Sequence, residues 1–167
     1  FTMIVLYLVL AVLVLLLAVV LLRTAAFRPK AEPTAPCEPV EFDREAAVSR
    51  LQQLVRCRTV SYTDAAKEDP AEFEKLIGLL PQLYPHVFEV CTLTRLPDRA
   101  LLFYWPGQAH EEASVMMAHY DVVPVEEENW EKPPFAGLLE DGVLWGRGTL
   151  DTKVTFNGVL SAANYLI

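Results

Sequence analysis

The stretch Ser114–Val125, "SVMMAHYDVVPV", decides how the rest of the chain is interpreted. Residues 115–118 are apolar and are typical of a buried strand, and this run leads directly into His119 and Asp121. Burying an ionisable group is unfavourable unless the group has a partner. The stretch therefore predicts a strand that ends at a site where both side chains find partners.

His119 and Asp121 are two positions apart, so on a regular strand both side chains project from the same face. A neutral imidazole is a common zinc ligand, and a nearby carboxylate can fix its tautomer. Taken alone, the pair also fits a histidine at a strand end and a turn-forming aspartate before Pro124. Both interpretations are open at this point.

A second acidic position follows in residues 144–153, "LWGRGTLDTK". Gly146 and Gly148 permit tight backbone geometry just before Asp151, which we place at the start of the final helix. A carboxylate at that point is held rigidly enough to bind a ligand. Asp is also a preferred N-cap residue, so Asp151 could simply cap the helix, and the two roles can coexist.

The pattern of apolar residues and turn signals predicts an α/β arrangement. Helical spacing predicts helices over residues 42–55, 70–85 and 151–167, with Pro81 ending or kinking the second. Runs rich in β-branched and aromatic residues predict strands over 86–96, 100–107 and 113–121. The Asp141-Gly142 pair predicts a hairpin, because this dipeptide favours a tight turn.

The amino-terminal residues predict a membrane segment. Met3–Leu22 contains 20 residues without a charge, and at about 1.5 Å per residue a helix of this length crosses a hydrocarbon layer of ~30 Å. The apolar region of a cleaved signal peptide is usually shorter, roughly 7–15 residues, and follows positive charge. We therefore expect an uncleaved anchor, and a signal cleaved after Ala26 is the alternative.

Three segments are expected: an anchor or signal over residues 1–27, a proline-rich tether over 28–40, and a domain over 41–167. Arg23, Arg28 and Lys30 follow the apolar span, and the positive-inside tendency would place their side of the membrane in the cytoplasm.

Charge and cysteine content exclude some functions. The chain has 14 Lys and Arg against 22 Asp and Glu, a net charge of −8, and no basic cluster interleaved with aromatics, so we expect no nucleic-acid partner. Cys37, Cys57 and Cys91 are far apart and form no CxxC pair, so they predict neither a cysteine metal site nor a particular disulfide.

Two linked motifs carry a family resemblance. "MMAHYDVVPV" followed by "NWEKPPFAGLLEDGVLWGRGTLDTK" resembles the first half of the catalytic domain of the aminoacylase and carboxypeptidase dizinc hydrolases. Within that family the chain is most similar to the branch of carboxypeptidase S and the N-fatty-acyl-amino-acid synthase/hydrolases, where W-x-x-x-P-F and G-x-L-W-G-R-G recur. The resemblance covers residues 42–167 and implies the N-terminal portion of a zinc-peptidase domain, with a mixed sheet flanked by helices.

The resemblance also implies roles for three residues. His119 matches the histidine that binds one zinc ion, Asp121 the catalytic carboxylate that orients it, and Asp151 the carboxylate that bridges two zinc ions. The implied reaction is hydrolysis of amide bonds in peptides or N-acyl amino acids, or its reversal. Many relatives carry a second Asp after the bridging one, where this sequence has Thr152, and we treat that difference as a feature of the branch.

Other parts of the family's active site have no counterpart in these residues. A Glu-Glu pair, a further acidic ligand and a last histidine are expected beyond Ile167, as is a lid domain through which relatives dimerise. Residues 1–167 alone are therefore expected to be inactive, and a non-catalytic membrane-tethered module is the alternative. Anchored and secreted relatives of this branch work in a lumen or outside the cell, so the resemblance implies an extracytoplasmic domain, against the charges after the span.

Overall fold

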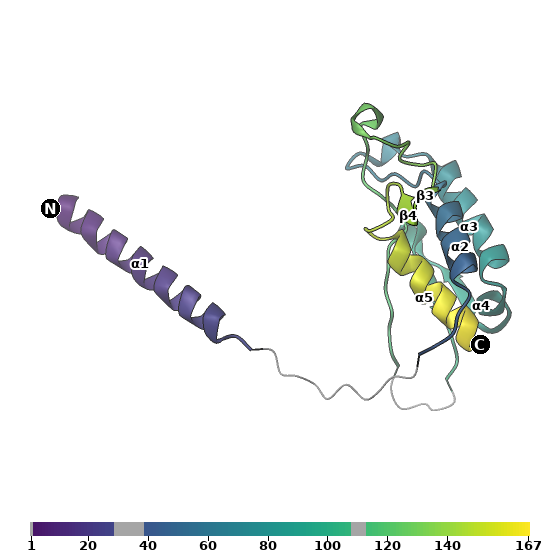
Figure 1. Ribbon diagram of the computed structural model, residues 1–167, viewed down its shortest axis with the longest axis horizontal. Coiled ribbons are helices and arrows are strands. Elements are labelled where there is room, and N and C mark those ends of the chain that lie inside the picture. The colour runs from purple at the N-terminus through teal and green to yellow at the C-terminus, as the bar shows by residue number, and fades with distance from the viewer. Residues whose placement is uncertain (1, 29–38, 108–112) are drawn as a thin grey trace. The chain divides into compact units, whose positions relative to one another are not determined.

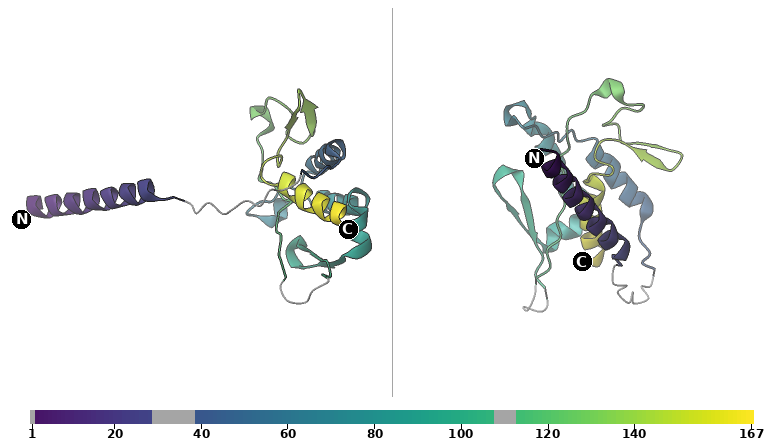
Figure 2. Two further views of the ribbon diagram at one scale, coloured as in Figure 1. Left: turned by 60° about the horizontal axis from the view of Figure 1, so that its bottom comes forward. Right: turned by 90° about the vertical axis from the view of Figure 1, so that its left-hand side faces the viewer.

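The computed structural model describes residues 2–28, 39–107 and 113–167 (Figures 1 and 2). The chain divides into two compact units, Phe1–Val40 and Glu41–Ile167, which are considered separately. Most of the expected tether, residues 29–38, lies outside the described residues.

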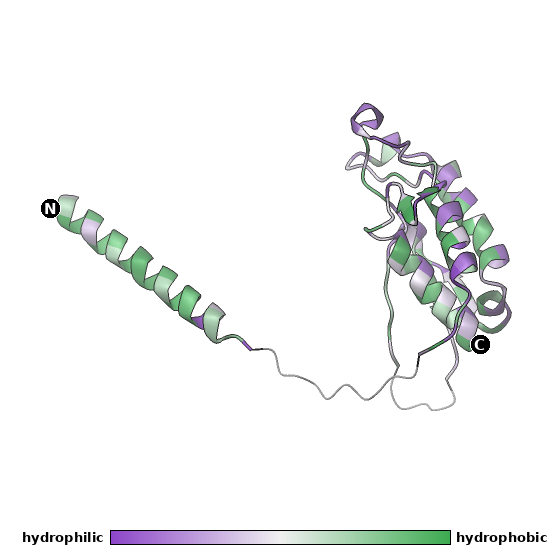
Figure 3. Ribbon diagram, viewed as in Figure 1, coloured by the Kyte–Doolittle hydropathy of each residue, from purple (hydrophilic) through white to green (hydrophobic). Residues whose placement is uncertain are grey.

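The first unit contains one long helix, α1 (Thr2–Ala26). It is apolar along most of its length, as Figure 3 shows, with Arg23 in its last turn, and none of its residues is buried. Its 25 residues are long and apolar enough to cross a membrane, and its place near the N-terminus is shared by signal sequences. The helix is therefore consistent with a single membrane anchor or a signal peptide.

The second unit is a mixed helix and strand structure whose longer helices are α2 (Arg44–Val55), α3 (Pro70–Leu83) and α5 (Lys153–Leu166). The three helices expected from the sequence are confirmed. Asp43 caps α2 by accepting a hydrogen bond from the Ala46 amide at 2.9 Å, and Asp69 caps α3 in the same way. Pro81 does not end α3, because it lies in the last turn of a helix that continues to Leu83.

The expectation of one strand over residues 86–96 is wrong in its first half. Residues Pro85–Val90 form a short helix, α4, before strand β1 (Thr92–Arg95) begins. Pro85 suits the first turn of a helix, and the Asn164 side chain of α5 accepts hydrogen bonds from the next two amides, those of His86 at 2.9 Å and Val87 at 3.4 Å. This contact from a distant helix satisfies the start of α4 and overrides the local β preference.

The strands form two separate antiparallel hairpins, which lie apart with α5 between them (Figure 2). β1 pairs with β2 (Leu101–Tyr104), with Leu93 opposite Phe103. β3 (Leu138–Glu140) pairs with β4 (Val143–Trp145) across the turn predicted at Asp141-Gly142. Both turn residues have positive φ, 49° and 77°, as tight hairpin turns require. Among the described residues of this unit there are also three 3₁₀ turns, Ala65–Lys67, Pro97–Arg99 and Glu127–Asn129.

The strand expected over residues 113–121 is not formed, and within the described residues neither is the mixed sheet. Val115, Met116 and Met117 are 74–83% exposed, and the one pairing near them is an isolated parallel bridge between Val60 and Val122. A cavity of about 370 Å³ lies between β2 and this segment. Neighbouring strands pair at a spacing of about 4.8 Å, and the two backbones on either side of this cavity form no ladder.

The core of the domain lies where the helices meet. α5 packs against α2 and α4 (Figure 1), and its residues Phe156 and Leu160, one helical turn apart, join the buried cluster. The cluster also contains Leu54, Cys57, Leu76, Leu80, Leu83, Tyr84 and Val87. Tyr84 is fully buried and donates its hydroxyl hydrogen to Asn157 Oδ1 at 2.7 Å, so this polar group in the core is satisfied.

Lys153, the first residue of α5, is also wholly buried. Its ammonium donates to the carbonyl oxygens of Leu54 at 2.8 Å and Cys57 at 2.6 Å, at the C-terminal end of α2. Burial lowers the pKa of Lys153 from 10.5 to about 8, and the nearby Cys57 and Glu72 oppose that shift. The ammonium therefore joins the end of α2 to the start of α5.

Replacing this lysine tests that connection. We expect Lys153→Met to lower the free energy of unfolding by about 1–3 kcal/mol, because two buried carbonyl groups lose their charged donor. Urea unfolding of the whole chain in detergent, followed by tryptophan fluorescence, measures the change. Lys67→Met, at an exposed lysine, is the matched control and should leave stability unchanged. Equal stability of the two variants would contradict the role given to Lys153.

Candidate metal-binding site

The three residues predicted to form the metal site, His119, Asp121 and Asp151, meet at one point on the surface of the domain. His119 Nδ1 lies 3.1 Å from Asp121 Oδ1, and His119 Nε2 lies 3.2 Å from Asp151 Oδ1. The Asp151 side chain is 90% exposed and that of His119 52% exposed, so both side chains are open to solvent. The fold thus brings together a histidine and an aspartate that are 32 residues apart in the sequence.

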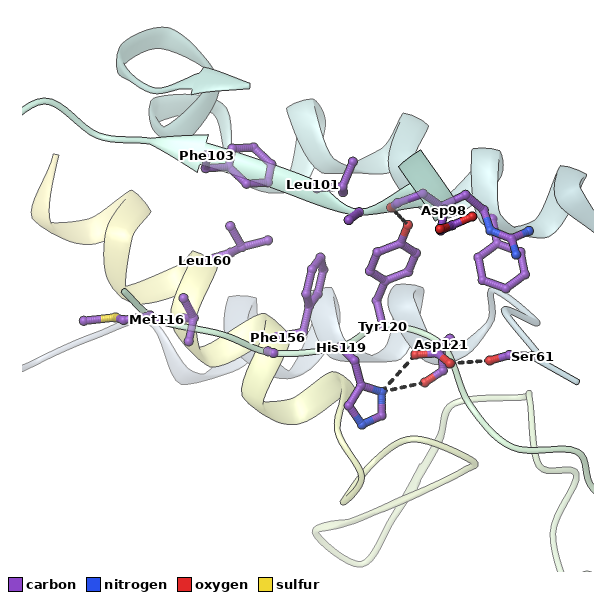
Figure 4. A pocket seen from close by; sticks show the side chains of 15 residues that line it. Ser61, Asp98, Leu101, Phe103, Met116, His119, Tyr120, Asp121, Phe156 and Leu160 are labelled. Carbon is purple, nitrogen blue, oxygen red and sulfur yellow. Dashed lines mark hydrogen bonds and ion pairs between the residues drawn. The ribbon is translucent and has the colours of Figure 1, made fainter. Parts of the chain in front are cut away.

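Alternation along the extended segment 118–122 sets the direction of each side chain. His119 and Asp121 lie on one face, as their spacing predicts, and Tyr120 points to the opposite face (Figure 4). The Tyr120 ring packs edge-on against Phe73, with centroids 6.2 Å apart, and lies 5.6 Å from the Phe156 ring. Its hydroxyl donates to the Arg99 carbonyl. Because Tyr120 is anchored in this way, its two neighbours are directed outward.

Asp121 has a second partner that the sequence did not indicate. The Ser61 hydroxyl donates to Asp121 Oδ2, while Oδ1 faces His119 (Figure 4). Ser61 lies in the polar stretch "TVSYTD", where no periodicity or motif distinguishes it from Ser or Thr residues in any loop. Its approach to Asp121 depends on a contact between segments 60 residues apart, so no local sequence signal could have found it.

A tightly packed loop positions Asp151. Gly148 has a φ of 92°, and a Cβ there would lie 2.9 Å from Val122 Cγ1 and 3.1 Å from Lys153 Cδ. Such contacts leave no room for a side chain, so glycine lets the loop lie directly against the segment that carries His119. The Gly148 carbonyl accepts a hydrogen bond from the Lys153 amide at 2.9 Å, which ties the loop to the start of α5.

Of the two roles that the sequence left open for Asp151, the structure does not use that of helix cap. The N-cap position of α5 is Thr152, which makes no side-chain capping bond. The Asp151 carboxylate lies outside the helix and faces His119, because the buried Lys153 fixes where α5 begins. Asp151 is therefore not used as a cap in this structure.

Two carboxylates surround the His119 imidazole and change its pKa. Partial burial lowers the pKa of His119, but its hydrogen bonds to Asp121 and Asp151 and the negative charges of both carboxylates outweigh that effect. The net result is a pKa above the usual 6.5. The site thus attracts positive charge, whether a proton on the imidazole or a cation beside it.

The chemistry of these donors suits zinc in part. An imidazole nitrogen and a carboxylate oxygen are common zinc ligands, and catalytic zinc sites have three protein ligands and one open position. Within residues 2–28, 39–107 and 113–167, no group of three or more His, Cys, Asp or Glu side chains is arranged to hold a metal ion. The described residues therefore supply two converging donors and their supporting carboxylate, and further ligands are needed to complete a site.

The other acidic and histidine candidates are used elsewhere. His86 pairs with Glu89 on the exposed side of α4 at 3.4 Å. In the 3₁₀ turn that follows Glu126, Glu127 pairs with Arg58, and Glu126 accepts a hydrogen bond from Asn129. Among the described residues, these groups make their contacts away from His119.

Comparison with known proteins gives a consistent set of matches. The model of peptidase family M20/M25/M40 matches residues 115–167. The chain is 35% identical over 135 residues to an N-fatty-acyl-amino acid synthase/hydrolase of Xenopus tropicalis, covering 78% of this chain and 26% of that protein. It is 33% identical over 137 residues to the same enzyme of Homo sapiens, covering 77% and 27%.

A third relative is carboxypeptidase S of Saccharomyces cerevisiae, with 31% identity over 121 residues, 66% of this chain and 21% of that protein. The chain thus spans about a quarter of the length of the curated relatives that it matches.

The raised pKa of His119 can be measured in metal-free protein. An NMR titration should give a pKa above 6.5, and Asp151→Asn should lower it because one negative partner is removed. The stabilisation from the protonated imidazole should be fully present below about pH 6.5 and lost as the pH rises through the raised pKa. His86 serves as the internal control. A pKa of His119 that is unaffected by Asp151→Asn would contradict the contact.

Proposed function

Because this chain belongs to peptidase family M20/M25/M40, we propose that residues 41–167 form part of a zinc-dependent hydrolase of amide bonds. The observation that carries the proposal is the meeting of His119 Nε2 and Asp151 Oδ1 at 3.2 Å on an exposed surface. The proposed substrates are peptides or N-acyl amino acids, because the relatives are a carboxypeptidase S and N-fatty-acyl-amino acid synthase/hydrolases.

Each of the three residues has a proposed role. His119 would bind one zinc ion through Nε2, and Asp151 would bridge two zinc ions through its exposed carboxylate. Asp121 would act behind the histidine, accepting a hydrogen bond from Nδ1 so that Nε2 is the nitrogen directed at the metal. This division of roles is supported by position, because Asp121 lies on the Nδ1 side of the imidazole and Asp151 on the Nε2 side.

Zinc ions bound here would supply Lewis acidity toward the carbonyl oxygen of the scissile amide. The contribution of this chain is to hold the ligand atoms in place before substrate arrives. His119 is fixed by Asp121, Asp121 by Ser61, and Asp151 by the packing of the Gly148 loop. Because the same residues would serve either direction of a reversible reaction, N-acyl amino acid formation and hydrolysis are equally compatible with the geometry.

We propose that these residues are part of a protein of about the same length as the relatives. The remaining zinc ligands and the general base would lie in the other part of that protein. Two donors are too few for a catalytic zinc site, and the relatives are about four times as long as the matched stretch. A further domain that closes over the substrate or forms a homodimer would belong to that part. On this proposal, residues 1–167 alone have no hydrolase activity.

We also propose a membrane-anchored arrangement, with residues 1–27 as the anchor, 28–40 as a tether and 41–167 as a domain on the extracytoplasmic side. The apolar surface of α1 supports the anchor. Arg23, Arg28 and Lys30 favour the opposite orientation, and residues before the span could outweigh them, since topology depends on both flanks.

Zinc content tests the proposed roles in the full-length protein. We expect about two zinc ions per chain in the wild type, and fewer in His119→Ala and Asp151→Ala, because each change removes a ligand. Amidase activity should fall by at least about 100-fold, since even supporting residues of metal sites contribute 10–100-fold. His86→Ala, at an exposed histidine outside the site, is the matched control. Wild-type protein without zinc would contradict the proposal and favour a non-catalytic tethered module.

Glycosylation tests the orientation. The chain contains no N-x-S/T acceptor, but Glu131→Thr completes one at Asn129, the exposed last residue of the 3₁₀ turn Glu127–Asn129. If the domain is extracytoplasmic, this variant should gain one glycan in a eukaryotic membrane preparation, while Glu131→Val, which creates no acceptor, should not. N-terminal sequencing of the same material shows whether the span stays attached. An unmodified Glu131→Thr variant that is cut by protease from the cytoplasmic side would show that the positive charges decide the topology.

A further inference from the structure

Two short segments are bound together beside His119. The Ser61 amide donates to the Val122 carbonyl at 2.9 Å, and the Val122 amide donates to the Thr59 carbonyl at 2.8 Å. The Thr59 hydroxyl adds a bond to the Tyr120 carbonyl at 2.5 Å. We call residues 59–61 with 120–122 the backbone clip. It holds Ser61 directly beside Asp121, although the two are 60 positions apart in the sequence.

The Asp121 carboxylate needs a restraint that the backbone clip does not provide. Its side chain is 45% exposed, so rotation about its terminal torsion is not blocked by packing. The Ser61 hydroxyl donates to Oδ2, and this bond turns Oδ1 toward His119 Nδ1, 3.1 Å away. The Asp121 backbone carbonyl lies at the same distance from Nδ1, so the carboxylate is one of two groups that hold the imidazole. Without the hydroxyl, Oδ2 would face solvent and the carboxylate plane would be free to turn.

From this arrangement we propose that Ser61 is a positioning residue for the metal site. Its hydroxyl fixes the plane of the Asp121 carboxylate, which fixes the imidazole of His119 with Nε2 toward the metal. The inference rests on the proposed zinc site. It adds to that site a residue that acts through Asp121 and His119, three contacts away from the metal, in a polar loop that carries no recognisable motif.

The backbone clip offers a matched control for the hydroxyl itself. Thr59 and Ser61 each place one hydroxyl on the partner segment, and Thr59 is fully buried. The Thr59 hydroxyl contacts a backbone carbonyl, whereas that of Ser61 contacts the Asp121 side chain. Thr59→Val therefore weakens the clip and spares Asp121, while Ser61→Ala spares the backbone bonds of the clip and frees Asp121.

The experiment measures Zn²⁺ affinity of the full-length protein by competition with a chromogenic chelator. We expect Ser61→Ala to bind Zn²⁺ about 10-fold more weakly than wild type, the lower end of the range for supporting residues. Ser61→Thr keeps the hydroxyl and should restore wild-type affinity. Thr59→Val should have a lower melting temperature but bind Zn²⁺ as the wild type does.

The outcomes separate this inference from the proposed function. If the wild type binds Zn²⁺ and Ser61→Ala binds it equally well, the positioning role is wrong and the zinc site stands. If Thr59→Val and Ser61→Ala weaken binding equally, Ser61 acts only through the fold, and the inference is also wrong. If the wild type binds no Zn²⁺, both the inference and the proposed function are overturned.

Discussion

The hydrogen bonds of the buried Lys153 ammonium to the end of α2 are the interaction on which the rest of the domain depends. A buried charge is tolerated only with close partners, and here the carbonyl groups of Leu54 and Cys57 provide them at 2.8 and 2.6 Å. These bonds fix where α5 starts relative to the end of α2. Asp151 is two residues before Lys153, and the Gly148 loop packs against the lysine stem, so the position of the acidic residue follows from this buried contact.

Polar side chains along α5 make the other connections between distant elements. Asn157 accepts the Tyr84 hydroxyl hydrogen and donates to the Ala47 carbonyl at 3.0 Å, which links α5 to α2 and to the residue that joins α3 to α4. Asn164 satisfies the first amides of α4. Each of these groups is buried or nearly so and each has its partner, so the bonds define one arrangement of the helices instead of several with similar apolar packing.

The site is built in layers from this frame outward. The helices hold the aromatic contacts of Tyr120, and Tyr120 directs its neighbours His119 and Asp121 toward solvent. The backbone clip then places Ser61 on Asp121, and the Gly148 loop places Asp151 on the other side of the imidazole. A two-donor surface of this kind suits the proposed site, which other ligands would complete, because both donor side chains are exposed while hydrogen bonds and the packed Gly148 loop hold them in place.

The sequence alone determined the local structure wherever the pattern was strong: α1 from its uncharged span, α2 and α5 from helical spacing, α3 despite Pro81, and the β3–β4 hairpin from Asp141-Gly142. It also determined that His119 and Asp121 share a face, because alternation is a property of any extended chain. Only the tertiary structure decided that residues 85–90 are helical, that Thr152 and not Asp151 occupies the N-cap, that residues 113–121 remain unpaired, and that Ser61 meets Asp121. Each of these depends on a partner far away in the sequence, such as Asn164 for α4 or Leu54 and Cys57 for Lys153, and local propensity carries no information about such contacts.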